Sequence, residues 1–548
     1  MVSLFLLILT LFTFQFQIGV LISSQTIPNQ DDSYIKFIQN ANTLPTTEKY
    51  DYIIIGGGTA GCPLAATLSS NFSVLVLERG SDPNAFPMVL SQEGMANTLT
   101  DDDNGHNPFQ RFVSEDGVEN IRGRVLGGGS MINVGFYSRA QPEFFKNSSV
   151  QWDMAMVEEA YRWIEETVVS RPEFGPWQLA FKEALVEAGV GPDNGYDLNH
   201  VVGTRIGGSI FDSRGKRHGA VELLNKANPI NLKVATQATV KRIIFSQSNG
   251  LSATGVLYSD SNGKLHKATI SKNGEIILSA GAIGSPQLLL SSGVGPKSHL
   301  SSLKLPLVLH NRHVGQSMAD NPRFGATVVL PFLTRPTSVQ VVGTLKPNIH
   351  IESLSTILPF SISPPFALLP PRSSGVNLSL AIFAGKFSTV SSTGSLRLDR
   401  RKNPIVRFNY LSHPDDLERC VEGVRKVGEL VNTKVMERIK TRDLEGKMGF
   451  EFLGRSLPEN MSDYGLVGEF CRKTVTTFWH YHGGCLVGKV VDGNYKVIGI
   501  NNLRVVDGST FSLSPGTNPM ATVMMLGRYV GLKMLHQRLG QRSKPFGN

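Results

Sequence analysis

The chain of 548 residues has little of what marks several specialised protein classes. Only four cysteines occur, which excludes a disulfide-dense scaffold. The net charge is +9, yet charged residues make up only 18% of the chain, and Lys and Arg never form a run of five or more. A nucleic-acid partner is therefore not expected. No internal repeat and no low-complexity tract is visible, which indicates an ordinary globular protein, long enough for at least two domains.

Long apolar stretches are also scarce. Residues 1–22 form the only one, and the small residues Ser23 and Ser24 follow it. This pattern resembles a secretory signal peptide of residues 1–24, although no Lys or Arg marks its start, so an uncleaved anchor is the alternative. No other stretch is long enough to cross a bilayer, and no stable membrane span is expected once the signal is removed. We expect an extracellular, apoplastic or vacuolar protein, and four glycosylation sequons agree with this: Asn71, Asn147, Asn377 and Asn460.

The chain does contain a dinucleotide-binding pattern. A short β-branched run at residues 53–55 suits a strand that is buried on both faces. Gly56, Gly58 and Gly61 follow with the spacing G-x-G-x-x-G, in which glycines permit a tight turn and let backbone amides approach a diphosphate. A glycine-rich turn without a ligand is the alternative explanation of this spacing alone.

The residues after the glycines indicate the kind of nucleotide. A helix is expected from near Thr59, and its N-terminus would carry the phosphates. A returning strand at residues 74–77 ends at Glu78, near the offset at which a carboxylate reaches a ribose hydroxyl. Because an acid at this position suits a free ribose, FAD or NAD is favoured over NADP.

The rest of the chain predicts a two-domain organisation of class α/β (α+β). Strand and helix patterns assign residues 25–322 to a Rossmann-like domain, in which the long excursion at residues 81–107 is of a kind that commonly covers a site. Proline clusters and alternating segments at residues 323–463 predict an antiparallel β-sheet that shapes a substrate site. Residues 464–548 return to the first domain.

The returning segment carries two histidines in an aromatic setting, His480 and His482. They could be metal ligands, but no third ligand stands nearby, so no metal is expected. They could also be two core histidines with satisfied hydrogen bonds. The functional alternative is that one of them is a general base at the face of a flavin.

The chain resembles the glucose-methanol-choline (GMC) oxidoreductases, a family of flavoproteins. The resemblance covers everything from residue 50 onward and rests on four motifs in order. These are the glycine fingerprint with its acid, GRVLGGGSMIN at 123–133, SAGAIGSPQLLLSSGVG at 279–295, and HYHGG, DGST and NP near the C-terminus. Within the family the chain is similar to plant (R)-mandelonitrile lyases and to alcohol-oxidising relatives of the HOTHEAD protein.

This resemblance implies FAD as the cofactor and implies roles for individual residues. His480 falls at the catalytic histidine, and Asn518 falls where the family keeps a second histidine or an asparagine. The implied catalytic residues are His480, Asn518 and His482. The lyases also have a cysteine pair that matches Cys420 and Cys471, which implies a disulfide. The implied FAD-binding residues are Gly56, Gly58, Thr59, Ala60, Gly61, Glu78, Arg79, Gly128, Ser130, Asn133, Val240, Trp479, His480, Asp507, Gly508, Asn518 and Pro519.

Two reactions on a small-molecule substrate fit these residues. Our leading expectation is cleavage of an aromatic cyanohydrin, in which His480 takes the hydroxyl proton, cyanide departs and FAD stays redox-silent, because the likeness to the lyases runs through the whole chain. The alternative is oxidation of an alcohol. It is favoured by Asn518 and Phe478, which stand where the lyases have a second histidine and a phenol. A flavoprotein without catalysis is a third possibility, and a monomer is expected.

Overall fold

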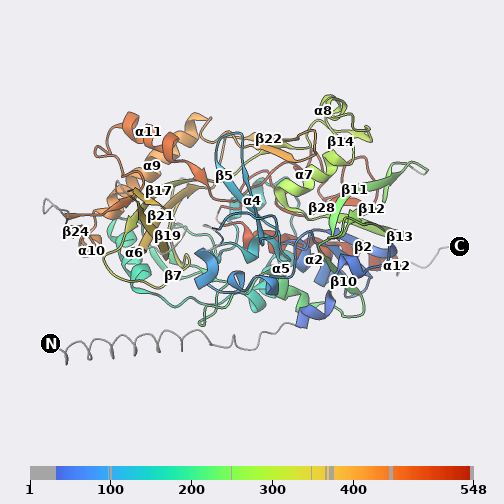
Figure 1. Cartoon of the computed structure of the whole chain (residues 1–548), viewed down its shortest axis with the longest axis horizontal. Helices are drawn as coiled ribbons and strands as arrows, with labels where there is room; N and C mark the ends of the chain where they lie inside the picture. Colours follow the sequence, from blue (N-terminus) through green and yellow to red (C-terminus); the bar gives the residue numbers. More distant parts are fainter. Residues whose placement is uncertain are drawn as a thin grey trace.

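A computed structural model describes residues 33–542, apart from 97, 99–100, 249, 347, 364–366, 370–375, 443–447 and 517. The expected signal peptide, residues 1–24, lies outside the described residues. The molecule is elongated, with one large β-sheet toward each end (Figure 1). Within the described part of the chain, no helix has the length and apolar character that a membrane crossing requires.

The first sheet has eight strands and is mostly parallel. Its order is β1-β10-β3-β2-β13-β12-β11, and β28 also pairs with β13. The antiparallel strands β11 and β12 extend one edge. The strands are β1 (Ile38–Asn40), β2 (Thr47–Ile55), β3 (Val74–Leu77), β10 (Leu232–Thr236), β11 (Thr239–Ser246), β12 (Ser252–Ser259), β13 (Leu265–Leu278) and β28 (Leu503–Val505).

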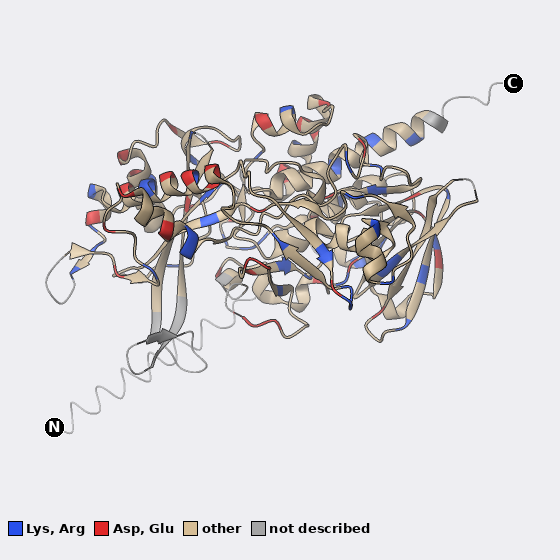
Figure 2. Ribbon diagram, turned by 90° about the horizontal axis from the view of Figure 1, so that it is seen from above, with Lys and Arg blue, Asp and Glu red and all other residues tan. Residues whose placement is uncertain are grey.

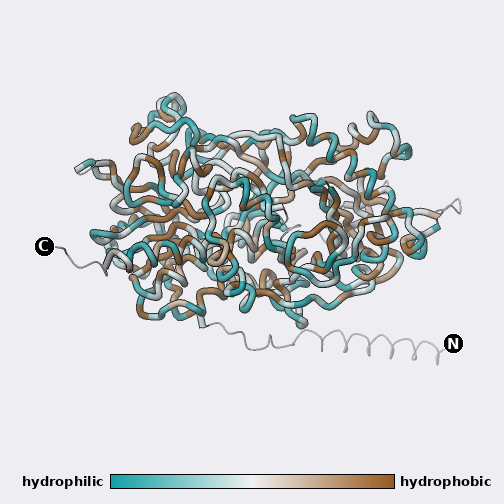
Figure 3. The backbone as a smooth tube through the Cα atoms, turned by 180° about the vertical axis from the view of Figure 1, so that it is seen from behind, coloured by the Kyte–Doolittle hydropathy of each residue, from teal (hydrophilic) through white to brown (hydrophobic). Residues whose placement is uncertain are grey.

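Both faces of this sheet are covered, which explains the uninterrupted apolar run at its centre. Successive side chains of a strand point to opposite faces, so Ile54 packs with the helices α2 (Gly61–Leu68) and α12 (Met520–Arg542). Ile53 and Ile55 pack on the other face, together with α7 (Gly281–Ser291). The strongly hydrophobic segments accordingly run through the interior, and hydrophilic segments lie mostly at the outer loops (Figure 3).

The second sheet has nine strands, and all of its pairs except β7–β8 are antiparallel. Its order is β26-β17-β21-β19-β18-β8-β7, with β20 on β19 and β27 on β17. The two sheets confirm the expected fold class. The strands are β7 (Asp193–Tyr196), β8 (Gly203–Ile206), β17 (Pro322–Val329), β18 (Val341–Leu345), β19 (Ile349–Ser363), β20 (Ala367–Leu369), β21 (Val376–Phe387), β26 (Phe452–Leu453) and β27 (Thr476–Thr477).

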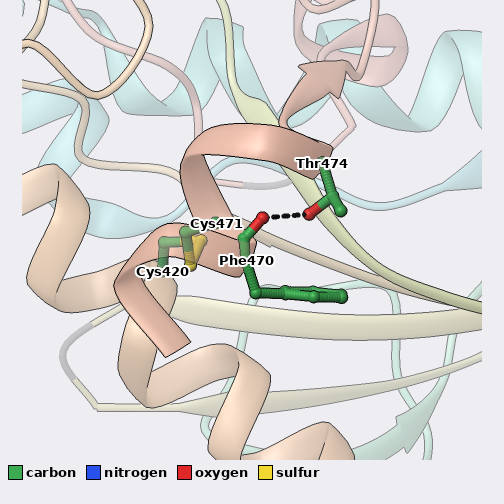
Figure 4. The surroundings of a disulfide bond; sticks show 4 residues. All are labelled: Cys420, Phe470, Cys471 and Thr474. Atoms are coloured by element: carbon green, nitrogen blue, oxygen red, sulfur yellow. Dashed lines mark hydrogen bonds between the residues drawn. A yellow bond between two sulfur atoms is a disulfide. The ribbon is translucent and has the colours of Figure 1, made fainter. Parts of the chain in front are cut away.

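A disulfide lies beside the second sheet. It joins Cys420 on α9 (Pro414–Val431) to Cys471 on α11 (Tyr464–Thr474), with their Cα atoms 6.2 Å apart (Figure 4). This is the pair that the family resemblance implied. Because α11 leads directly into β27, the bond fixes the segment that precedes the histidines. Acidic and basic residues are dispersed over the ribbon of the whole molecule (Figure 2).

Candidate active site

A cavity of about 800 Å³ is lined by residues of both sheets. Gly56 and Gly58 of the glycine fingerprint form its wall on the side of the first sheet, and residues of β17, β19 and β21 form its wall on the other. The long excursion after β3 contributes Met95 and Thr98 to the lining, and Gln92 of this excursion donates a hydrogen bond to the carbonyl of Pro336 at 2.7 Å. The excursion therefore contributes to the wall of the cavity, and its role as a cover stays a prediction.

Two glycine loops meet at the nucleotide end. Gly56 has a φ of +102°, and Gly128 at the start of a 3-10 turn (Gly128–Met131) has a φ of +60°. A Cβ atom on Gly128 would lie 2.8 Å from the Cα of Gly58, so the loops approach too closely for any side chain. Gly61 does not line the cavity, but a Cβ atom there would lie 2.0 Å from the carbonyl oxygen of Gly56. Its role is to let α2 pack closely on the turn.

The acid at the end of β3 lines the same cavity. The two carboxylate oxygens of Glu78 accept hydrogen bonds from the backbone N–H groups of Gly57 at 3.0 Å and Gly80 at 2.8 Å. Burial raises the pKa of this carboxyl, while the backbone donors act in the opposite direction. Each oxygen keeps a lone pair with which it can accept a ribose hydroxyl. Arg79 is held beside it by Gln110 and by the carbonyl of Gly123.

A second carboxylate, Asp507, also lines the cavity. Asp507 is buried and accepts hydrogen bonds from the N–H of Gly281 at 3.0 Å and from the hydroxyl of Ser285 at 2.5 Å. It thereby ties the loop after β28 to the start of α7. The glycine cradle, the two carboxylates and the space between them fit an extended dinucleotide such as FAD.

Every residue that the resemblance assigned to FAD binding, except Gly61, lines this one cavity. Their contacts with the cofactor stay a prediction. The lining residues of this set are Gly56, Gly58, Thr59, Ala60, Glu78, Arg79, Gly128, Ser130, Asn133, Val240, Trp479, His480, Asp507, Gly508, Asn518 and Pro519.

The loop that carries His480 and His482, here called the histidine loop, begins directly after β27 of the second sheet. Pairing of β27 with β17 places residues 476–477 beside residues 322–323, and the segment that precedes β17 continues along the loop. Asp320 lies in that segment and accepts a hydrogen bond from the backbone N–H of His480 at 2.7 Å. Its other oxygen accepts from the hydroxyls of Thr477 and Tyr410, each at 2.6 Å. The loop is therefore held by charge-assisted hydrogen bonds.

His480 is the only histidine among the described residues that line the cavity. Its Nδ1 atom lies 3.2 Å from Nδ2 of the buried Asn321, which leaves Nε2 as the other ring nitrogen. Burial is the main cause that holds the pKa of His480 well below its usual range, and the charge of Lys386 adds to it. The imidazole is therefore neutral at neutral pH, as a base must be.

His482 does not line the cavity. It is buried, its Nδ1 atom lies 3.0 Å from the carbonyl oxygen of His480, and its backbone pairs with Ala319. The structure therefore places it behind the loop, where it supports the loop conformation. No cluster of three His, Cys, Asp or Glu residues that could hold a metal occurs in the described ranges.

The sequence did not identify three charged residues at this end: Lys386, Glu352 and Asp320. The Nζ atom of Lys386 donates a hydrogen bond to Oδ1 of Asn518 at 2.7 Å and pairs with Glu352 at 3.2 Å. Lys386 and Glu352 lie on β21 and β19, outside every motif, and Asp320 lies just before β17. The only signal was a charged residue in each of two alternating strands, which is too common to identify a site.

The remaining wall of this end is apolar. A small hydrophobic cluster with members on β18, β19 and β6 (Phe136–Tyr137) forms it, and Trp479 adds an indole ring. The cluster residues that line the cavity are Phe136, Val339 and Leu354, with Val134 and Ile382 packed against them. Such a wall suits an aromatic or aliphatic substrate body.

The glycine loops of the first sheet suit a dinucleotide, and the antiparallel second sheet forms the opposite wall of the cavity, with the histidine loop between them. This arrangement is typical of a flavoprotein that binds its substrate against a second sheet. Two models of the GMC oxidoreductase family match the chain, one at residues 50–323 and one at residues 390–527. The chain therefore belongs to the GMC oxidoreductases. It is an FAD-dependent enzyme, as the family resemblance implied.

Its relatives include both kinds of enzyme that the sequence suggested. Sinalpyl alcohol oxidase Nec3 of Nesocodon mauritianus is 51% identical over 540 residues, which cover 97% of this chain and 96% of the relative. (R)-Mandelonitrile lyase 1 of Prunus serotina is 49% identical over 541 residues, which cover 98% and 96%. A solved structure of formate oxidase from Aspergillus oryzae matches 91% of this chain and 100% of its own with a TM-score of 0.74, and at 19% identity it shows the fold alone.

Proposed function

We propose that this enzyme oxidises an aromatic alcohol to the corresponding carbonyl compound. The observation that carries the proposal is the pair of groups at the reactive end of the cavity: one neutral histidine, His480, and one amide, Asn518. An amide does not titrate, so the site has one base and one hydrogen-bonding group for the substrate oxygen. The apolar wall with Phe136 and Leu354 suits the aromatic ring.

In this proposal His480 accepts the hydroxyl proton at Nε2. The ring hydrogen must then be at Nδ1, where the side chain of Asn321 can accept it through Oδ1. That oxygen is buried and has no hydrogen-bond partner among the described residues in the present orientation of the amide, and a half-turn would bring it to Nδ1. As the proton leaves, the substrate oxygen gains negative charge, which Asn518 stabilises as a donor. Bound FAD would supply the acceptor for the hydride of the carbon.

Cleavage of an aromatic cyanohydrin is the second candidate function. It is supported by the 49% identity to a mandelonitrile lyase over nearly the whole chain and by two cations at this end, Lys386 and Arg323. His480 would take the hydroxyl proton and return it to cyanide, whose charge the cations would stabilise. Glu352 and Asp320 offset these cations, and Phe478 offers no phenol, so the chain provides little besides His480 for this step.

Anaerobic visible spectroscopy of the holoenzyme separates the two reactions. The protein is mixed with benzyl alcohol, cinnamyl alcohol or racemic mandelonitrile, and cyanide is assayed in parallel. Bleaching of the flavin by an alcohol without cyanide release is the expected result. Cyanide release with an unchanged flavin band would establish the second candidate, and neither change at full FAD occupancy would indicate a flavoprotein without catalysis. His480→Ala should abolish either reaction, whereas His536→Ala, at an exposed position of α12, should not.

We also propose that the chain follows the secretory route. Asn71, Asn147 and Asn460 are exposed and can carry glycans, while the side chain of Asn377 lies outside the described residues. The disulfide between Cys420 and Cys471 suits an oxidising compartment. Expression in plant cells, followed by glycosidase digestion and localisation of the protein, tests this. A protein retained in the cytosol without a mass shift would contradict it.

A further inference from the structure

A buried ion pair lies at the candidate active site, where Glu352 lines the cavity. Lys386 is 0% exposed and Glu352 is 2% exposed, and Nζ of the lysine lies 3.2 Å from a carboxylate oxygen of the glutamate. Removing two charges from water costs about as much as their attraction returns, so a buried pair contributes little to stability by itself. Its presence beside a catalytic cavity calls for another explanation.

A second contact of the ammonium group supplies one. Nζ of Lys386 donates a hydrogen bond to Oδ1 of Asn518 at 2.7 Å. An ammonium group has only donors, so it selects the orientation in which the carbonyl oxygen of the amide faces the lysine. A half-turn would place the amide N–H₂ against the cation, donor against donor. The group that Asn518 offers to an oxygen in the cavity is therefore its N–H₂.

We propose that the Lys386–Glu352 pair is a positioning device that holds Asn518 as a hydrogen-bond donor toward the substrate oxygen. Burial lowers the pKa of Lys386, and the charge of Glu352 acts against this and favours the ammonium form. This inference rests on the proposed function only in assigning that oxygen to the substrate. It gives Asn518 the fixed role of hydrogen-bond donor, whereas an amide without the contact to Lys386 could present either its oxygen or its N–H₂ group.

The register of the second sheet keeps this device rigid. Lys386 pairs with His350 across the β19–β21 ladder, and Glu352 pairs with Ala384 two residues further along, so both charged side chains emerge on the same face. Nζ also lies 4.3 Å from the centre of the Phe478 ring, at the start of the histidine loop. The ammonium group of Lys386 thus contacts both Phe478 in the histidine loop and Asn518.

A double-mutant cycle measured by binding tests the proposal. The ligand is benzoate, an aromatic carboxylate whose oxygen mimics the charged substrate oxygen, and its dissociation constant is taken from the change in the visible spectrum of the oxidised holoenzyme. Asn518→Leu should weaken binding about tenfold, because it removes one donor to a charged acceptor. Lys386→Met with Glu352→Gln, which removes both charges, should weaken it by a similar factor. The triple variant should bind no more weakly than the pair variant.

The cycle needs no turnover, so it stands or fails independently of which reaction the enzyme performs. If the losses multiply in the triple variant, the pair acts separately from Asn518 and the proposal is overturned; unchanged binding in the pair variant would overturn it as well. Should that variant not retain FAD, Lys386→Met with Glu352→Leu replaces it, since an apolar pair is tolerated better. The matched control is the ion pair of Lys233 and Glu48, which does not line the cavity. Its removal by Met and Gln should leave benzoate binding unchanged.

Discussion

The buried carboxyl group of Asp320, which accepts a hydrogen bond from the histidine loop, leads to a prediction about the pH dependence of stability. Burial raises the pKa of Asp320 to about 6 from its ordinary 3.8, although the hydroxyls of Thr477 and Tyr410 act against this rise. An acid whose pKa is raised by folding binds more protons in the native state than in the unfolded state between these two values. Stability from this group is therefore present at low pH and is lost as the pH rises toward 6 and beyond.

The magnitude follows from the difference between the two pKa values. About 2 pKa units at roughly 1.4 kcal/mol each give about 3 kcal/mol over the full range, of which about 2 kcal/mol falls between pH 4.5 and pH 7. Asp320→Asn cannot ionise and lacks this loss. For a chain of 548 residues the entropy of unfolding is on the order of 1.1 kcal/mol/K, so 2 kcal/mol corresponds to about 2 °C in Tm.

The assay is the Tm of the FAD-saturated protein at pH 4.5 and at pH 7, for wild type and Asp320→Asn. The variant minus wild-type difference should become more positive by about 2 °C from the lower to the higher pH. Asp399→Asn is the control, because hydrogen bonds in a turn lower the pKa of Asp399, so this group titrates below the pH range of the assay and its variant minus wild-type difference should stay nearly constant. A difference for Asp320→Asn that is constant with pH, or that becomes more negative, would refute the reasoning.

Three further perturbations test other parts of the molecule. Asn321→Leu removes the contact at Nδ1 of His480 and should lower kcat at least tenfold while FAD remains bound, as kinetics and the flavin spectrum would show; unchanged kcat would contradict the assigned ring orientation. Gly128→Ala places a Cβ atom 2.8 Å from the facing glycine loop and should abolish FAD loading, measured by the ratio of flavin to protein absorbance. Replacing Cys420 and Cys471 by Ser opens a loop with a sequence separation of 51 and should cost about 4 kcal/mol of stability, seen as a lower Tm; an unchanged Tm would contradict this.

Local spacing in the sequence singled out Gly56 and Glu78, and the family resemblance added His480. All three belong to short motifs and line the cavity. Asp320 and Lys386 could not be found in this way. Asp320 accepts a hydrogen bond from the backbone N–H of His480, which is 160 positions away in the chain, and Lys386 is 132 positions from Asn518. Only the pairing of β17 with β27 and of β19 with β21 brings them there, and that register is set by the folding of the whole second sheet.

The fold class was predictable for a related reason. Parallel strands with covered faces give uninterrupted apolar runs, and antiparallel strands give alternating ones, so the two sheets differ in their sequence patterns. Strands β7 and β8, residues 193–206, belong to the second sheet although they precede most of it in the chain. Their short, glycine-containing sequences carry little periodicity, so no sequence pattern indicated this pairing.

The separation of the two walls of the cavity has a consequence for how such enzymes diversify. Phe136 and Val134 apart, the apolar wall is built by Val339, Leu354 and Ile382, on or beside strands of the second sheet, whereas the cofactor cradle is built by glycine turns of the first. A substitution in the apolar wall alters the space for a substrate without moving a backbone atom of the cradle. Selection can therefore change the substrate, and even the reaction that follows removal of the hydroxyl proton, with little effect on cofactor binding. A history of this kind accounts for alcohol oxidases and cyanohydrin lyases among relatives that share about half of their residues with this chain.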